Sequence, residues 1–414
     1  MIKILQVRNI DSFVESRRQK TSEKDRKTVQ SILNDVRKNG DSAVKKYERK
    51  FNGRKTSQLR VSAKEIKEAL SKISRKEISA FQTMSARLRK SSPKIQIRGS
   101  SKFVPIPSVG CYIPGGQARY PSSVVMSVIP AKIAGVKRIV VVSPPSRDGK
   151  IDPLTIAAAK KCGATEIYKV GGAQAIGALA YGTKSIPKVD KIVGPGGKFV
   201  SIAKSLVNDQ TAIDMVAGPT ELGIIADESS DPELVAIDLI SQAEHSKDTM
   251  CFVITQSKTM AKQIQMKEFL ITRLTERSSI IEESISKNGF IAVCKNQNQM
   301  IELANKIAPE HLELMVKNAK TLSKKITGAG LVLIGKNTPS AASDYLLGTN
   351  HILPTNGFGR TRGGLSVLDF LKLQTVVETK KSELEFFLHL KELKALTDAE
   401  GLPNHYKAVK RRLD

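Results

Sequence analysis

Tryptophan is absent from the 414-residue sequence, and aromatic residues make up only 5 % of it. The four cysteines are scattered without a CxxC pair, which excludes a disulfide framework or a zinc knuckle and indicates reduced thiols in a core. No stretch approaches the roughly 18 to 20 consecutive apolar residues of a membrane helix, and the first residues lack the pattern of a signal peptide. We therefore expect a cytoplasmic protein with no membrane partner.

Acidic residues are scarce relative to basic ones, because 40 Asp and Glu stand against 67 Lys and Arg, a net charge of +27. Such an excess favours a basic nucleic-acid-binding protein, which is a distant alternative. The basic residues fall largely in segments of helical spacing, however, and none of these segments carries the interleaved aromatic rings on which single-stranded nucleic acids stack. We interpret the charge as solvated helix faces and expect no nucleic-acid partner.

The chain from Arg138 onward alternates short β-branched runs with longer amphipathic segments, a pattern typical of parallel α/β architecture. Three strand-helix units fit between Arg138 and Pro219, and a second series runs from ELGIIAD to GLVLIG. The residues before Ser101 and those after Asp369 look mostly helical. We predict four regions, which are a helical N-terminal region (1–110) packing on the second α/β domain, a first α/β domain (111–220), a second α/β domain (221–368) and a C-terminal dimerisation tail (369–414).

Two glycine-rich turns are candidate ligand-binding loops, VGCYIPGGQARYPSS at 109–123 and IVGPGGKFV at 192–200. Paired glycines expose backbone N–H groups to a phosphate, and ligands of open α/β sheets bind at the carboxyl ends of strands. No GxGxxG fingerprint occurs, and the near match to a P-loop from Gly330 to Asn337 is interpreted as a buried strand. A tight turn without a ligand explains both turns equally well.

The five histidines include several that lie beside other potential metal ligands. Gln242 and His245 stand at i and i+3 near the end of an expected helix, so their side chains share one face. Further candidates lie in two downstream loops, Asp344 with His351 and Glu400 with His405. One of these carboxylates and one of these imidazoles would complete a tetrahedral zinc site. The alternative for His245 is a solvated histidine at a helix end.

Glu310 and His311 are adjacent in APEHLEL, between an expected helix and an apolar strand. Loops between rigid elements commonly hold catalytic groups. A histidine titrates near neutral pH and suits general-base work, and a neighbouring glutamate can deprotonate or orient a water molecule. A capping or surface pair is the alternative interpretation of these two residues.

Nine segments carry a family resemblance: YIPGG with YPSSVVMSVIPAKIAGV, VGGAQAIGALAYGT, VDKIVGPG, IDMVAGPTE, DLISQAEH, APEHLEL, SDYLLGTNHILPT, GLSVLDFL and EGLPNHYKAV. In this order, and from about residue 10 to 412, they resemble histidinol dehydrogenases. The resemblance implies oxidation of L-histidinol through L-histidinal to L-histidine, with NAD and one zinc ion per subunit. It also implies two incomplete Rossmann-like parallel-sheet domains with a helical N-terminal region and an extended C-terminal tail, in an intertwined homodimer whose sites are shared between subunits.

The resemblance also implies roles for particular residues. The zinc ligands would be Gln242, His245, Asp344 and His405, with His405 reaching in from the other subunit. His311 would take the alcohol proton, and Glu310 would activate the water that adds to the aldehyde. Contacts to substrate would come from the metal ligands and His311 together with Thr220, His351 and Glu400, and contacts to the cofactor from Tyr112, Gln174 and Gly197.

Two positions depart from the family pattern. Gly197 stands where the family usually has asparagine, so a side-chain contact to the cofactor is missing and a backbone N–H takes its place. Thr220 replaces the commoner serine and keeps the hydroxyl. A related zinc-dependent dehydrogenase of another polyol or a sulfonated alcohol is the alternative, and the presence of Glu310, His351 and Glu400 favours histidinol over it.

Overall fold

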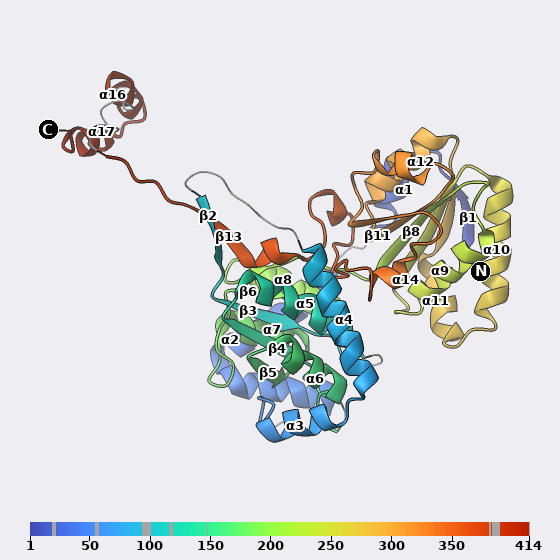
Figure 1. Ribbon diagram of the computed structural model, residues 1–414, viewed down its shortest axis with the longest axis horizontal. Helices are drawn as coiled ribbons and strands as arrows, with labels where there is room; N and C mark the ends of the chain where they lie inside the picture. Colours follow the sequence, from blue (N-terminus) through green and yellow to red (C-terminus); the bar gives the residue numbers. More distant parts are fainter. Residues whose placement is uncertain are drawn as a thin grey trace. The chain divides into compact units, whose positions relative to one another are not determined.

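The computed structural model describes residues 1–18, 22–53, 58–92, 101–115, 119–146, 148–380, 382 and 390–413. The chain forms two compact units. The first comprises Met1–Pro93 and Pro105–Leu371, and the second comprises Lys94–Val104 and Lys372–Asp414. Figure 1 labels the helices and strands, and the two α/β domains both belong to the first unit.

The first α/β domain is built on a five-stranded sheet in the order β5-β4-β3-β6-β7, with every pair parallel. Its strands are β3 (Ser108–Tyr112), β4 (Arg138–Ser143), β5 (Glu166–Lys169), β6 (Lys191–Val193) and β7 (Ala212–Ile213). The connecting helices are α5 (Pro121–Ala134), α6 (Pro153–Cys162), α7 (Gly172–Tyr181) and α8 (Lys198–Val207). Local sequence sets the helix ends: the Asp152 side chain accepts from Leu154 N at 3.0 Å at the start of α6, and Gly163 ends that helix at φ 103°.

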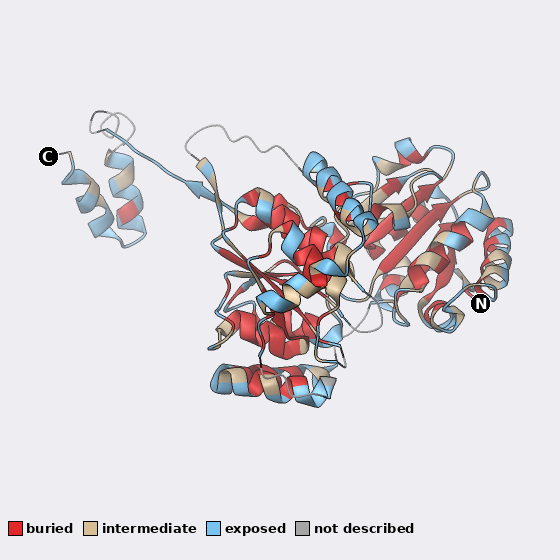
Figure 2. Ribbon diagram, turned by 60° about the horizontal axis from the view of Figure 1, so that its bottom comes forward, coloured by how far each residue is buried: buried red, intermediate tan, exposed pale blue. Residues whose placement is uncertain are grey.

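Alternate residues of these strands enter two different cores. Val109 and Val141 pack with α5 and α6, whereas Val140 and Tyr112 pack with α7 and α8. Helices therefore cover both faces of the sheet, which explains why its strands read as continuous apolar runs. Figure 2 shows the resulting buried strands between partly exposed helices.

The second α/β domain has a six-stranded sheet in the order β1-β10-β9-β8-β11-β12, also parallel throughout. Its strands are β1 (Lys3–Gln6), β8 (Glu221–Ala226), β9 (Met250–Thr255), β10 (Phe290–Val293), β11 (His311–Met315) and β12 (Leu331–Ile334). Its helices are α1 (Ile10–Glu15), α9 (Pro232–Ala243), α10 (Lys258–Thr272), α11 (Ser278–Asn288), α12 (Gln297–Ile307), α13 (Ala319–Ser323) and α14 (Ser340–Ser343). The near match to a P-loop is the strand β12, as expected, but of its four residues only Leu333 is buried.

Both sheets follow one topology. Numbered from its own first strand, the sheet β3 to β7 runs 3-2-1-4-5, and β8 to β12 repeat this order, with β1 added beside β10. This is the Rossmann order without its sixth strand. The protein is therefore an α/β protein with two incomplete Rossmann-like domains, as expected.

The N-terminal helices correct one part of the prediction. We expected residues 1–110 to pack on the second α/β domain. Within the described ranges β1 and α1 do so, and α4 (Arg75–Ser91) reaches it through hydrogen bonds from Arg87 and Ser91 to Leu346 and Gly348. The helices α2 (Glu23–Asn52), α3 (Ala63–Ser71) and α4 pack on α7, α6 and α5 of the first domain. The reason is the apolar face of α2, where Leu33 and Val36 are buried against a core that includes Ile176 and Leu179.

The strands β2 (Ser101–Pro105) and β13 (Leu371–Thr375) form a two-stranded sheet, and all but one residue of each strand belongs to the second unit. The helices α16 (Leu390–Ala399) and α17 (Pro403–Lys410) of this unit pack on each other. The tail is thus helical only in part, because residues 371–375 form a strand. Most side chains of α16 and α17 are exposed (Figure 2).

The structure bears on two features of the sequence, the scattered cysteines and the lack of long apolar stretches. All four cysteines are buried and unpaired. Within the described ranges, no helix combines the length and the apolar character that crossing a membrane requires.

Candidate active site

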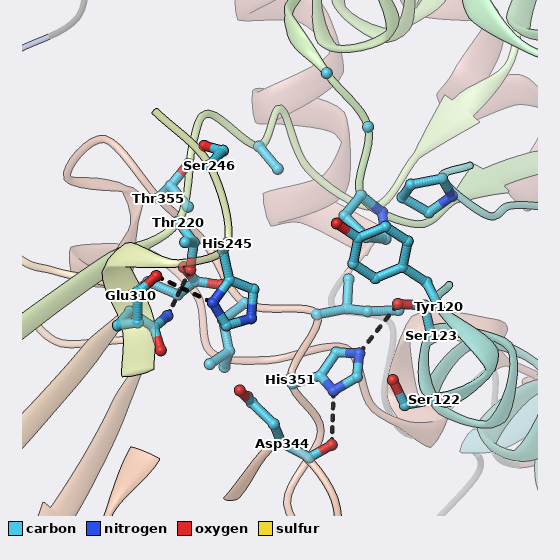
Figure 3. A pocket seen from close by; sticks show the side chains of 18 of the residues that line it. Tyr120, Ser122, Ser123, Thr220, His245, Ser246, Glu310, Asp344, His351 and Thr355 are labelled. Carbon is cyan, nitrogen blue, oxygen red and sulfur yellow. Dashed lines mark hydrogen bonds between the residues drawn. The ribbon is translucent and has the colours of Figure 1, made fainter. Parts of the chain in front are cut away.

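A cavity of about 590 Å³ in the first unit brings together most of the predicted site residues. It is lined by loops of the first α/β domain, including Pro114 and Pro195–Gly197, and by residues of the second domain. Figure 3 shows side chains from these segments converging on one space. The predicted residues that line it are Gly197, Thr220, Gln242, His245, Glu310, His311, Asp344 and His351.

The two sheets present opposite edges to this cavity. Pro114 and the loop after β6 lie at the carboxyl ends of their strands, at the switch point between β3 and β6. Thr220 and Glu310, in contrast, immediately precede β8 and β11. The expectation that ligand-binding loops lie at carboxyl ends therefore holds for the first sheet, whereas the second contributes its amino edge. The return helix α9 brings Gln242 to that edge because it runs back past the sheet.

A chain of hydrogen bonds joins three of the residues. The Thr220 hydroxyl donates to Oε2 of Glu310, and the backbone N–H of Glu221 donates to the same oxygen at 2.9 Å. Nε2 of Gln242 donates to the Thr220 oxygen at 2.8 Å. Because the amide nitrogen of Gln242 is used in this way, its carbonyl oxygen is the atom left to bind a cation.

His311 and Glu310 both line the cavity although both side chains are buried. Nδ1 of His311 lies 3.9 Å from Glu310, Nε2 lies 3.5 Å from Asp344 Oδ1, and neither ring nitrogen has a hydrogen-bond partner among the described residues. Burial lowers the pKa of the imidazole, but the carboxylates of Asp344 and Glu310 outweigh it and raise this pKa to about 9. Burial raises the pKa of Glu310, and His311 and Thr220 oppose the rise.

We expected His245 to lie on the helix, but α9 ends at Ala243 and His245 follows two residues later. Its Nδ1 is 3.0 Å from the backbone oxygen of Gln242, an arrangement in which Nδ1–H donates and Nε2 keeps its lone pair. Burial raises the pKa of Asp344, but the neighbouring His311 outweighs this effect and lowers it. These features leave a ring nitrogen and a carboxylate free to bind a metal.

His351 has both ring nitrogens engaged. Nδ1 is 2.8 Å from the backbone oxygen of Asp344, and Nε2 is 3.2 Å from the Ser123 hydroxyl of α5 (Figure 3). Burial lowers its pKa, which favours the neutral ring. His351 thus links the Asp344 loop to the first α/β domain and is a poorer metal-ligand candidate than His245.

Tyr112 and Gln174 lie in a second cavity of about 740 Å³ along the carboxyl edge of the first sheet. Gly172 N donates to the Tyr112 hydroxyl at 3.1 Å, and Gln174 Nε2 donates to the buried Glu48 at 2.8 Å. Oε1 of Gln174 has no hydrogen-bond partner within the part of the chain that is described. The predicted cofactor residues are thus divided, because Gly197 lines the first cavity and these two line the second.

Glu400 and His405 belong to the second unit, apart from the residues that line the first cavity. Glu400 follows α16 and His405 lies on α17, and both are exposed. Residues 116–118 of the first glycine-rich turn lie outside the described residues.

Several residues that line the cavities, or that hydrogen-bond to residues lining them, were not predicted. Glu221 accepts from Glu310 N at 3.3 Å and from Asn356 N at 3.0 Å, and Arg277 lines the first cavity with a backbone φ of 62°. Glu48 comes from α2, far from the other cofactor residues in sequence. Other lining residues, such as Tyr120, Ser123 and Gly196, had a signal, since they fall in the glycine-rich turns at 109–123 and 192–200.

The donor set fits zinc in part. Among the described residues, no three His, Cys, Asp or Glu side chains are arranged to hold a metal ion. Three of the four candidates nevertheless line one cavity, as an amide oxygen, an imidazole nitrogen and a carboxylate. This mixture of nitrogen and oxygen donors suits zinc and leaves the set one ligand short.

Comparison with known proteins agrees with the fold. Residues 15–413 match the model of the family described as histidinol dehydrogenase. Histidinol dehydrogenase of Methanococcus maripaludis is 43 % identical over 400 residues (94 % of this chain, 93 % of the relative), and that of Methanosarcina barkeri is 42 % identical over 399 residues (93 % and 91 %). The crystal structure of histidinol dehydrogenase from Elizabethkingia anophelis has a TM-score of 0.91 at 34 % identity and covers 100 % of this chain and 98 % of that one.

The fold and these similarities define an α/β oxidoreductase, so the protein is an enzyme. More narrowly, the chain belongs to the histidinol dehydrogenase family. Membership assigns it to histidinol oxidation in histidine biosynthesis.

Proposed function

We propose that this chain is a zinc-containing, NAD-dependent enzyme that oxidises L-histidinol through L-histidinal to L-histidine, the last steps of histidine biosynthesis. One observation carries the proposal. Three metal-ligand candidates, Gln242, His245 and Asp344, line the same cavity as the acid and base candidates Glu310 and His311. A cavity of about 590 Å³ accommodates a small amino alcohol together with one end of a cofactor.

Zinc would be held by Gln242 Oε1, His245 Nε2 and Asp344, with His405 of the partner subunit as the fourth ligand. Histidinol carries an amine and an imidazole, both neutral donors to zinc, so the bound metal supplies an anchor that orients the substrate. Thr220 and His351 line the same cavity as these ligands and would contact the substrate directly. Glu400 would be a further substrate contact in the assembled enzyme.

The protein side chains carry the proton transfers. In its deprotonated form, which a pKa of about 9 makes more populated at alkaline pH, His311 would accept the proton of the alcohol in the first oxidation, because each hydride leaves a carbon whose oxygen is losing a proton. Glu310 would accept a proton from the water that adds to the aldehyde in the second oxidation. Its Oε2 is held by Thr220 and Glu221 N, and this support fixes the carboxylate against the cavity.

The cofactor would lie along the carboxyl edge of the first sheet. Bound NAD accepts a hydride in each of the two oxidations. Residues two positions apart in the chain line the two cavities. Pro114 and Gly197 line the first cavity, and Tyr112 and Phe199 line the second. Gly197 is also the N-cap residue of α8, where free N–H groups favour a phosphate. A cofactor spanning both cavities would meet Tyr112, Gln174 and Gly197.

The test is a spectrophotometric assay of the purified protein with L-histidinol and NAD, followed by the absorbance of the reduced cofactor, together with zinc determination. We expect two reduced cofactors per histidinol and one zinc per subunit. Oxidation of another polyol or of a sulfonated alcohol in preference to histidinol would favour the related zinc-dependent dehydrogenases instead. The homodimer and the cytoplasmic location stay predictions.

A further inference from the structure

Two carboxyl groups lie in contact behind the candidate metal ligands. Glu313 on β11 is 1 % exposed, and Asp238 on α9 is half-buried. Their carboxyl groups interact with each other, and burial raises the pKa of both. Two acidic groups buried beside each other repel one another when both are ionised, so this environment favours a protonated carboxyl group. Oε2 of Glu313 has no hydrogen-bond partner within the described ranges.

The same glutamate also holds a second element. Ser340 N donates to Glu313 Oε1 at 2.6 Å, and Ser340 begins α14, the helix that ends at Asp344. Asp238 lies one helical turn before Gln242 on α9, and α9 packs against α14. One buried side chain therefore contacts both elements that carry metal-ligand candidates.

Glu313 is tied to the base candidate as well. It follows His311 by two residues on β11, so both side chains leave the same face of the sheet. Two apolar side chains would hold α9 on this face without the cost of burying carboxyl groups. An apolar side chain at position 313 would not accept the Ser340 N–H, however, and α14 would lose its tie to the strand.

We propose that Glu313, bridged to Asp238, is a positioning residue that sets the separation of Gln242 and Asp344 for metal binding. The proposal rests on the proposed zinc site at these residues. Glu313 itself lines neither cavity and contacts neither substrate nor metal in this scheme.

The test compares zinc affinity, measured by competition with a chromophoric chelator, and the visible spectrum of the cobalt-substituted protein. Glu313→Leu and Asp238→Leu should lower zinc affinity about 10- to 100-fold and change the cobalt spectrum, because outer-shell partners orient metal ligands. Glu313→Gln should retain both properties, since its amide can donate to Asp238 and accept from Ser340.

A matched control is Glu268→Leu. Glu268 is also buried in the second α/β domain, but it accepts from Ile2 N and Thr272 Oγ1 rather than from α14. This variant should lose thermal stability and keep the zinc affinity of the wild-type protein.

Leucine variants at 313 and 238 that bind zinc as tightly as Glu268→Leu, with an unchanged cobalt spectrum, would overturn the positioning role. If Glu313→Leu does not fold, Asp238→Leu decides, because its site is only half-buried. A wild-type protein that binds no zinc overturns the proposed metal site and this proposal together. If the wild-type protein and the leucine variants all bind zinc tightly, the proposed metal site stands and only the positioning role of Glu313 is overturned.

Discussion

At the scale of single residues, the hydroxyl of Thr220 lies between a metal-ligand candidate and a candidate base. It donates to Glu310 and accepts from Gln242, so one group orients both side chains. Thr220→Val keeps the shape of the side chain and removes both hydrogen bonds. A hydrogen bond to a charged group, such as the one to Glu310, contributes about 1.5–3 kcal/mol, and one between neutral groups, such as the one from Gln242, contributes less. We expect turnover to fall roughly 10- to 100-fold and zinc affinity to weaken, as measured by steady-state kinetics and chelator competition. Thr220→Ser is the control and should stay close to wild type; equal activity of the two variants contradicts this role.

Glu310 and His311 are adjacent, and their proposed roles belong to different oxidations. Glu310→Gln should slow oxidation of supplied L-histidinal more than that of L-histidinol, whereas His311→Asn should slow the alcohol step or both. Losses of roughly 10² to 10⁴ in turnover are expected for a general acid or base, with histidinol binding little changed. The two half-reactions are measured separately by starting from histidinol or from histidinal. Equal losses for both substrates in Glu310→Gln would show that this carboxylate orients the substrate or His311 instead.

At the scale of elements, the loop after β6 is anchored by a buried ion pair. Lys204 on α8 donates to Gly194 O at 2.9 Å and to Asp214, which in turn accepts from Gly194 N at 2.8 Å. Their side chains are 1 % and 0 % exposed. Lys204→Met leaves a buried carboxylate without its cation and should lower the free energy of unfolding by about 3–5 kcal/mol.

Chemical unfolding followed by circular dichroism suits this measurement, because the protein contains no tryptophan. The control is Lys247→Met, which removes an ion pair to Glu283 whose side chains are 58 % and 45 % exposed. Exposed pairs contribute about 0–1 kcal/mol. Similar losses in the two variants would mean that the buried pair does not stabilise the loop.

The elements that the sequence predicted well are those with strong periodicity or strong caps, such as β4 with its apolar run and α6 between Asp152 and Gly163. The strand β1 was missed because four half-exposed residues carry little pattern, and its pairing partner β10 lies far along the chain. We predicted the segment of β13 as part of a helix, because its residues show no alternation between buried and exposed positions. Within the site, the residue types came from motifs, but the contact of Glu313 with Ser340 or of Gln174 with Glu48 depends on tertiary packing that no local signal encodes.

At the scale of the whole molecule, His405 and the other metal-ligand candidates belong to different compact units. If His405 completes the site of a second subunit, His245→Asn and His405→Asn should each be inactive alone. Mixed dimers of the two would contain one intact site, so co-expression should restore about a quarter of wild-type activity. The measurement is turnover of the co-expressed pair against each single variant.

Truncation after Ala399 gives an independent measurement of the same arrangement. The α/β domains should stay folded, as judged by circular dichroism, while turnover is abolished. A fully active truncated monomer, or a co-expressed pair as inactive as its parents, would place the fourth ligand elsewhere.

The position of β1 at the edge of the second sheet has a consequence for how the protein is made. Lys3–Gln6 pair with Phe290–Val293, and Ile2 is locked in place by Glu268 and Gln265. A nascent chain emerging from the ribosome at about 5–20 residues per second must therefore wait roughly 15–60 s before this strand meets its partner. The first α/β domain, with α2 to α4, lies between the two and has its own core. Translation order thus favours completion of that domain first, while the opening residues of the polypeptide stay unpaired until the second sheet is synthesised.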